Sequence, residues 1–227
     1  LKDIIDWSGL PTTAHSKLLA DNIAANDAVV SQRLRDAGAI MMGKLSTHEF
    51  AIGGPSFDLP WPPAVNPWGG NHFPGGSSSG SGVALAAGMV PAALGTDTGG
   101  SVRNPASMCA IVGMKPSYGL ISRRGVFPLA NSLDHVGPMT RNVRDNALLL
   151  QVLASHDGDD PGSNHVQLGL HLRARALGSA RQRLQRRRRE LLPRGRRQRG
   201  HHVLDAGRAL GVHREAKLRL GGGSRRD

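Results

Sequence analysis

Two serine clusters in glycine-rich turns are the residues of this sequence best suited to chemistry. Both lie within residues 75–106, where a segment of small and apolar residues separates them. The second cluster is Ser101, in the sequence Asp-Thr-Gly-Gly-Ser, and the first contains Ser77, Ser78, Ser79 and Ser81. The glycines around them permit positive φ angles and a close approach of the backbone to a ligand. Such a setting suits a serine that attacks a carbonyl group, because nearby backbone N–H groups can stabilise the oxyanion that forms.

The turn that contains Ser101 is predicted to present such N–H groups. Residues 90–96 are predicted to form a short strand and residues 102–111 a helix, so Ser101 lies near a helix N-terminus. Unpaired N–H donors and the helix dipole favour negative charge at that position. We therefore expect the oxyanion or the substrate to be bound by the backbone of Thr98, Gly99 and Gly100.

This stretch resembles the signature of the amidase signature family, whose members cleave amides with a Ser-cis-Ser-Lys triad. The resemblance rests on motifs that fall in register, namely Gly75-Gly76-Ser77, Gly95-x-Asp97-x-Gly99-x-Ser101 and Val102-Arg103-x-Pro105. It continues through residues 112–119 and 133–139 and stops near residue 166. The resemblance implies that Ser101 is the nucleophile and that Ser77 is the bridging serine of a cis peptide.

The resemblance also implies a lysine followed by aspartate upstream of the serines, and two lysines compete for that role. Lys44 lies in a Gly-Lys-x-x-x-x-Glu-Phe-Ala segment, which resembles a different part of the family pattern. Lys2 is followed by Asp3 and resembles the segment that ends a buried strand and carries the base. Its separation from Ser77 (77 − 2 = 75) and that of Ser77 from Ser101 (101 − 77 = 24) also resemble the family spacing. We therefore predict that Lys2 is the base.

The proposed chemistry requires a neutral Lys2. A lysine can accept a proton from serine only when it is neutral, which requires burial or nearby positive charge to lower its pKa from about 10.4. Ser77 is then expected to pass the proton between Ser101 and Lys2, with a cis peptide aiming its hydroxyl. Asp97 and Arg103 are predicted to hold the loop around Ser101 rather than to contact the substrate.

Around these residues the sequence predicts an α/β fold. Residues 83–89 are predicted to form a buried helix, and residues 27–43 an amphipathic helix followed by a short strand at residues 39–42. A further helix is predicted over residues 144–155, whereas residues 52–74, rich in Gly, Pro and Trp, are predicted to form a long ordered loop. The resemblance implies a mixed β-sheet flanked by helices, which we expect to be incomplete at both ends of this sequence.

The composition changes near residue 166 and divides the chain into an amidase signature core, residues 1–166, and an Arg-rich tail, residues 167–227. The core holds 11 Lys and Arg against 13 Asp and Glu, whereas the tail holds 18 against 4. The tail contains no Ile, Phe, Tyr, Trp or Met, so it has little with which to build a core. Two interpretations stay open: a disordered or non-native tail read in a shifted frame, which the composition and the loss of resemblance favour, and a functional basic arm.

The function that the resemblance implies is hydrolysis of a carboxylic amide by an amidase, through an acyl-enzyme on Ser101. The alternatives are the A subunit of a tRNA-dependent amidotransferase and an inactive fragment or binding protein. We expect a small-molecule amide substrate, no cofactor, no metal, and a homodimer or amidotransferase partner subunits. The basic tail lacks the stacking aromatic residues that would favour nucleic acid. No apolar run approaches the roughly 18 residues of a membrane helix, so we expect a cytoplasmic protein.

Overall fold

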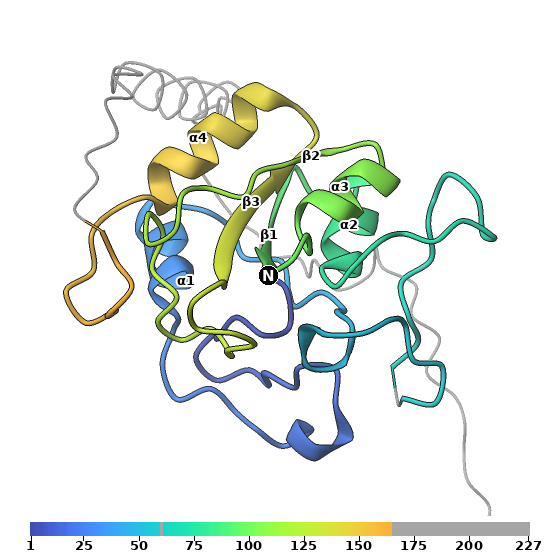
Figure 1. Cartoon of the computed structure of the whole chain (residues 1–227), viewed down its shortest axis with the longest axis horizontal. Coiled ribbons are helices and arrows are strands. Elements are labelled where there is room, and N and C mark those ends of the chain that lie inside the picture. Colours follow the sequence, from blue (N-terminus) through green and yellow to red (C-terminus); the bar gives the residue numbers. More distant parts are fainter. Residues whose placement is uncertain (60, 165–227) are drawn as a thin grey trace, which may run out of the picture. The chain divides into compact units, whose positions relative to one another are not determined.

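The structure is a computed structural model that describes residues 1–59 and 61–164 (Figure 1). Its helices and strands are α1 (Val29–Asp36), α2 (Ser79–Ala86), β1 (Ala92–Asp97), α3 (Arg103–Met108), β2 (Val112–Gly113), β3 (His135–Thr140) and α4 (Val143–Leu153). Two short 3-10 helices, Lys17–Leu19 and Glu49–Ala51, lie among the N-terminal loops. The tail predicted at residues 167–227 lies outside the described residues.

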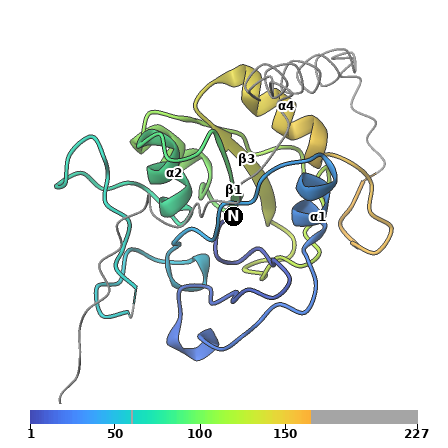
Figure 2. The same ribbon diagram turned by 180° about the vertical axis from the view of Figure 1, so that it is seen from behind.

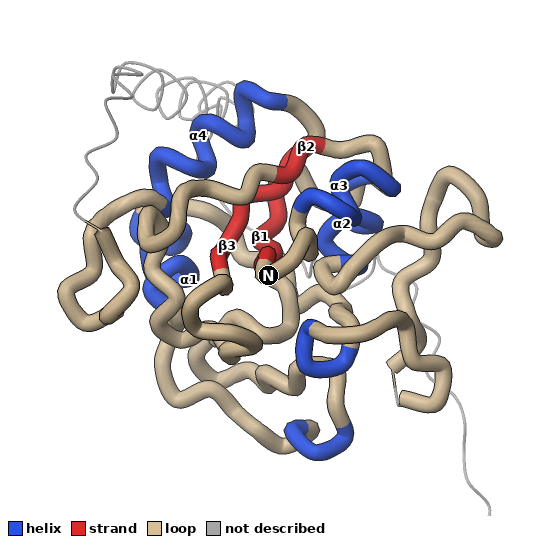
Figure 3. The backbone as a smooth tube through the Cα atoms, viewed as in Figure 1, coloured by secondary structure: helices blue, strands red, loops and turns tan. Residues whose placement is uncertain are grey.

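The three strands form one antiparallel sheet in the order β1-β3-β2, with β3 in the middle (Figure 3). Strand β1 pairs with β3 along its whole length, from Ala92 opposite Thr140 to Asp97 opposite His135. All six residues of β3 are buried. The sheet therefore forms the centre of the described fold, and the segment that leaves β1 meets the segment that enters β3 at one end of the sheet.

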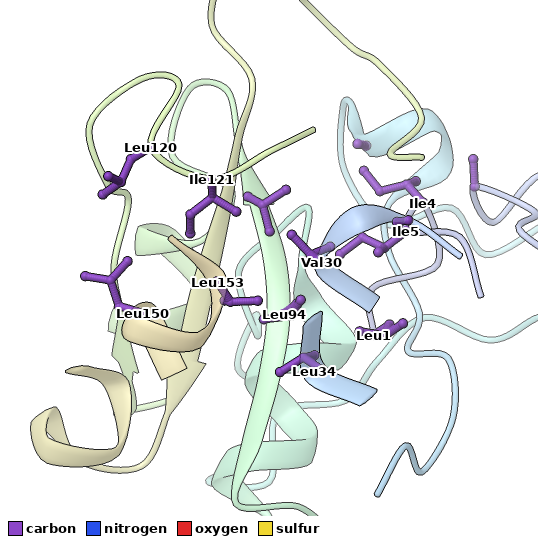
Figure 4. Close-up of a cluster of buried hydrophobic side chains, with 14 residues drawn as sticks. Leu1, Ile4, Ile5, Val30, Leu34, Leu94, Leu120, Ile121, Leu150 and Leu153 are labelled. Atoms are coloured by element: carbon purple, nitrogen blue, oxygen red, sulfur yellow. The ribbon is translucent and has the colours of Figure 1, made fainter. Parts of the chain in front are cut away.

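Helices flank this sheet, and its two faces belong to different hydrophobic clusters. Leu94 and Val136 lie in the cluster that contains Val30 of α1 and Leu150 and Leu153 of α4 (Figure 4). Ala93 and Met139 lie in a second cluster, with Leu85 of α2 and Val102. Figures 1 and 2 show α1 and α4 on one side of the strands and α2 and α3 on the other. The residues of β1 and β3 divide between the two clusters because successive side chains of a strand point to opposite faces of the sheet. Helices therefore cover both faces of the sheet, which confirms the predicted α/β class.

The first residues of the chain lie beside strand β1. The N–H of Lys2 donates to the carbonyl of Leu94 in β1 at 3.1 Å. On its other side, the N–H of Leu45 donates to Leu1 at 2.7 Å and the N–H of Asp3 donates to Leu45 at 2.9 Å, which makes a parallel bridge. This parallel bridge is isolated and lies outside the three strands, which pair only in antiparallel fashion, so the mixed sheet implied by the resemblance stays a prediction. The same bridge places Lys2 in the middle of the fold.

Two predicted elements differ from the structure. Residues 39–42 are not a strand, and Ile40 and Met42 are 86% and 74% exposed. None of the described strands lies beside them, and apolar composition alone cannot replace a hydrogen-bonded neighbour. Helix α2 begins at Ser79, four residues earlier than predicted, and ends before Gly88, whose φ of +72° stops the helix. Gly80 and Gly82 belong to the helix despite their low helix propensity, and the backbone of Ser46 approaches Gly80 too closely for a side chain there.

Candidate active site

Lys2 lies at the centre of the candidate site and has no exposed surface. Its Nζ is 2.7 Å from the hydroxyl oxygen of Ser77 and 2.7 Å from that of Thr96 in β1. Burial lowers the pKa of Lys2 to about 7, although the carboxylates of Asp97 and Asp134 raise it in part. Near neutral pH a large share of Lys2 is therefore uncharged and able to accept a proton from the hydroxyl that it contacts.

Ser77 follows Gly76 through a cis peptide bond, as predicted. Two contacts fix this peptide: the N–H of Gly76 donates to Asn104 Oδ1 at 3.0 Å, and the N–H of His48 donates to the Ser77 carbonyl at 3.1 Å. The imidazole of His48 covers Gly76 so closely that a Cβ there would collide with the ring. A glycine is therefore required at position 76 for steric reasons.

Ser101 lies on the turn before α3 and beside the first serine cluster. The N–H of Ser78 donates to the Ser101 carbonyl at 3.2 Å, so the two serine-containing turns are joined through their backbones. Ser101 is partly exposed, and its hydroxyl has no hydrogen-bond partner among the described residues. The structure thus brings the predicted nucleophile next to Ser77, with its oxygen available to another molecule.

Asp97, the last residue of β1, organises the turn that carries Ser101. Its buried carboxylate accepts the N–H groups of Gly100 (2.8 Å), Val102 (3.2 Å) and Arg103 (3.3 Å). It also forms a two-point contact with the Arg103 guanidinium, at 3.0 and 2.9 Å. Burial by itself raises the pKa of Asp97, but the hydrogen bonds from Arg103 and Val102 outweigh it and hold that pKa below its usual value. Asp97 and Arg103 therefore hold the loop, as predicted.

The three residues predicted for the oxyanion site differ in what their N–H groups do. The N–H of Gly100 is committed to Asp97, which corrects the expectation that it is available to a substrate. Its carboxylate acceptor is charged and buried, so this bond is not readily given up. Among the described residues, the N–H groups of Thr98, Gly99 and Ser101 have no acceptor. Thr98 and Gly99 therefore stay candidates, and the neighbouring N–H of Ser101 can take the place of Gly100.

Lys44, the competing lysine, has partners of another kind. Its Nζ is 3.2 Å from Asp3 Oδ1, and it donates to the carbonyl of Ile5 at 2.6 Å and to the Thr12 hydroxyl at 3.0 Å. Within the described part of the chain, none of the contacts of its ammonium group is to a serine of the two clusters. The geometry therefore favours Lys2 as the lysine of the site.

Thr96 and His48 belong to the site but were not found in the sequence. Thr96 is two residues after Leu94 on β1, so the period of a strand places it on the face that Lys2 contacts, a signal that could have found it. His48 had no such signal, because loop packing brings it to Gly76. Burial lowers the pKa of His48, and its Nδ1 lies 2.9 Å from the Gly53 carbonyl. Its buried Nε2 has no partner among the described residues.

A cavity of about 540 Å³ adjoins the site on the side of Thr96 and Thr98. Neither Ser77 nor Ser101 lines it. Its walls combine apolar side chains with polar residues, among them Tyr118, Arg123 and Asp134. The cavity therefore borders the site at Thr96 and Thr98 and not at the hydroxyls of Ser77 and Ser101.

The chain belongs to the amidase family, whose model, described as Amidase, matches residues 1–187. It is 50% identical over 166 residues to the A subunit of the glutamyl-tRNA(Gln) amidotransferase of Exiguobacterium sibiricum, a match that covers 73% of this chain and 35% of that protein. The crystal structure of the corresponding subunit from Thermotoga maritima superposes with a TM-score of 0.71 at 44% identity, over 74% of this chain and 37% of that one. The allophanate hydrolase of Kluyveromyces lactis gives a TM-score of 0.68 at 37% identity, over 73% and 27%.

This chain thus spans about a third of the length of the curated relatives it matches. The family match continues past residue 166, where the motif resemblance stops. Among the described residues, no helix has the length and apolar character needed to cross a membrane.

Proposed function

We propose that this chain carries the catalytic residues of an amidase, which hydrolyses a carboxylic amide through an acyl-enzyme on Ser101. Ser101 Oγ adds to the amide carbonyl carbon while its proton passes to Ser77, and the proton of Ser77 passes to Lys2 Nζ. The C–N bond then breaks, and the proton returns through Ser77 to the leaving nitrogen, which departs as an amine or ammonia. Water attacks the resulting ester through the same relay and releases the acid and free Ser101.

The contact between Lys2 and Ser77 is the observation that carries this proposal. A buried lysine with a pKa of about 7 lies 2.7 Å from the hydroxyl of Ser77, and the next residue, Ser78, donates its N–H to the Ser101 carbonyl. A lysine with no exposed surface is costly to keep unless it serves chemistry or an ion pair, and Lys2 contacts no carboxylate of the described residues. The N–H groups of Thr98, Gly99 and Ser101 are the donors that we assign to the oxyanion.

A fluorophosphonate tests this proposal, because it reacts with an activated serine and adds its phosphonyl group to Oγ with loss of fluoride. We expect the wild-type chain to gain one phosphonyl group on the peptide that contains Ser101. Ser101→Ala should abolish this mass increase. Ser107→Ala, which changes an exposed serine of α3, is the matched control and should react like the wild type. Equal labelling of the Ser101→Ala variant would contradict the proposal, and no labelling of the wild type would favour the binding-protein alternative.

A second candidate function is the A subunit of a tRNA-dependent amidotransferase. It is favoured by the names of the curated relatives at about 50% identity, which are A subunits of glutamyl-tRNA(Gln) amidotransferases. In this second function the same acyl-enzyme forms on Ser101, but the ammonia that is released passes to a partner subunit that acts on a charged tRNA. Glutamine hydrolysis that rises when charged tRNA is supplied together with the partner subunits would favour this function. Hydrolysis that is unaffected by them would favour the independent amidase.

A further inference from the structure

Asp134 is a carboxylate beside the site to which the motifs assign no role. It directly precedes β3, whose first residue, His135, pairs with Asp97 at the end of β1. Asp97 and Asp134 therefore lie at the same end of two paired strands, and both contact the turn that carries Ser101. This placement gives the turn two acidic neighbours rather than the single one that the motif suggests.

The carboxylate of Asp134 joins two segments that are distant in the sequence. Its Oδ1 accepts the hydroxyl of Thr98 at 2.6 Å. Its Oδ2 accepts the N–H groups of Leu129 and Ala130, each at 2.9 Å. The carbonyl of Ala130 in turn accepts the N–H groups of Leu133 and Asp134, so residues 129–134 form a closed turn around this side chain. Asp134 thus ties Thr98 to a turn that is itself fixed.

The two carboxylates hold different halves of the nucleophile turn. All the turn contacts of Asp97 go to Gly100 and the residues after it. Among the described residues, Asp134 alone forms a side-chain contact with Thr98, and Gly99 has no side chain. Thr98 and Gly99, two of the three residues with uncommitted N–H groups, are therefore restrained through Asp134.

We propose that Asp134 is a positioning residue of the amide-cleaving site, which holds Thr98 and Gly99 so that their N–H groups face the oxyanion. The inference rests on the proposed function, since it assigns these N–H groups to the reaction. The hydrogen bonds of Asp134 reach neither Ser77 nor Ser101, so it is not a catalytic residue. Preorganised donors are effective only when the turn that carries them does not have to reorganise during the reaction.

The charge of Asp134 gives the proposal a second readout. Burial lowers the pKa of Lys2, while Asp97 and Asp134 raise it. His48, whose own pKa is lowered by burial, also interacts electrostatically with Lys2. Removing the charge of Asp134 should therefore lower the pKa of Lys2 further, because less negative charge stabilises its ammonium form. This titration reports the charge of Asp134 near Lys2, whereas the labelling rate of a Thr98 variant reports the restraint on the turn.

The experiment compares three variants of the full chain. Asp134→Asn removes the charge and weakens the contacts, Thr98→Val removes the hydrogen bond but keeps the charge, and Asp159→Asn changes an exposed carboxylate of the same cavity. Lys2 is titrated by NMR through 13C-labelled lysine, and the rate of Ser101 phosphonylation is measured against pH. Thr98→Ser, which keeps the hydroxyl, tests for rescue.

We expect Asp134→Asn to move the midpoint of the Lys2 titration to lower pH. It should also slow the phosphonylation of Ser101 by roughly ten-fold at high pH, where the rate no longer changes with pH. Thr98→Val should slow labelling to a similar extent with the midpoint unchanged, Thr98→Ser should restore the rate, and Asp159→Asn should match the wild type. If Asp134→Asn matches Asp159→Asn in both measurements, the inference is wrong. If Asp134→Asn does not fold, the Thr98→Val variant tests the inference. A phosphonylation rate of Thr98→Val equal to that of the wild type at high pH then overturns it.

The two proposals fail in distinguishable ways. A wild-type chain that is not labelled at Ser101 contradicts the proposed function. The Lys2 titration and the amide exchange of Leu129 and Ala130 need no activity, so they still report whether Asp134 sets the charge of Lys2 and fixes the turn. A labelled wild type with an Asp134→Asn variant of equal rate and midpoint leaves the proposed function in place and removes the role of Asp134.

Discussion

Lys2 and Lys44 lie on neighbouring backbone segments, joined by the parallel bridge between Lys2 and Leu45, yet their surroundings give them different chemistry. Burial lowers the pKa of each lysine. Lys2 contacts the hydroxyls of Ser77 and Thr96, whereas Lys44 contacts the carboxylate of Asp3. A hydroxyl can give a proton to a neutral amine, but a carboxylate in contact stabilises the ammonium form. Contact partners, rather than burial alone, therefore distinguish Lys2, the proposed proton acceptor, from Lys44.

Exchanging each lysine for methionine tests this comparison with the largest expected effect. Lys2→Met should slow Ser101 labelling and amide hydrolysis by about 10²–10⁴, because the relay loses its base. Lys44→Met should leave both rates nearly unchanged but lower the free energy of unfolding by about 1–3 kcal/mol, because Asp3 loses its charged partner. The rates and urea denaturation of both variants measure this.

The second serine sharpens the same test. Ser77→Ala should also lose most of the rate, and the double variant with Lys2→Met should be little slower than the slower single variant, since the two side chains act as one relay. Losses that multiply would show two independent contributions. A folded Lys44→Met variant that has lost labelling, beside a Lys2→Met variant that has kept it, would reverse the assignment of the base.

The pH dependence of the rate is the next test of the comparison. The pKa of Lys2 is lowered to about 7, so its neutral form predominates above that pH and its ammonium form below. The labelling rate should therefore rise with pH through about 7, falling about ten-fold per unit on the acid side. The Lys44→Met variant should show the same rise in rate with pH, at the same midpoint. The residual rate of Lys2→Met should not rise with pH in this range. A Lys2→Met variant with an unchanged acid limb would exclude Lys2 as the base.

Sequence patterns located the groups of this site that lie in the glycine-rich motifs. Ser77, Ser101 and Asp97 occur there in fixed register, and the Lys-Asp pair at the start of the chain identified Lys2. The β1 strand and the α4 helix also followed from local sequence, a short apolar run that ends in a turn for β1 and apolar residues at helical spacing for α4. What a short segment dictates by its own backbone and spacing could therefore be predicted.

The remaining features depend on segments that meet only in the folded chain. Asp134 reaches Thr98 because β3 pairs with β1, and His48 reaches Gly76 through loop packing. The motif could not reveal that the N–H of Gly100 binds Asp97, since that depends on how tightly the turn closes. Residues 39–42 have the composition of a strand, but strand formation needs a neighbour, which composition does not supply.

Thr96, the second hydroxyl partner of Lys2, gives the smallest expected effect. Thr96→Val nearly preserves the shape of the side chain but removes the acceptor 2.7 Å from Lys2 Nζ. The ammonium form then loses a hydrogen bond, so the acid limb should move to lower pH. The neutral amine also loses the contact that orients it toward Ser77, and we expect the plateau rate to fall by roughly three- to ten-fold. Thr96→Ser keeps the hydroxyl and should restore both values. If Thr96→Val behaves like the wild type at every pH, then Ser77 alone orients Lys2, and the contrast with Lys44 depends on the Ser77 hydroxyl and on the carboxylate that Lys44 contacts.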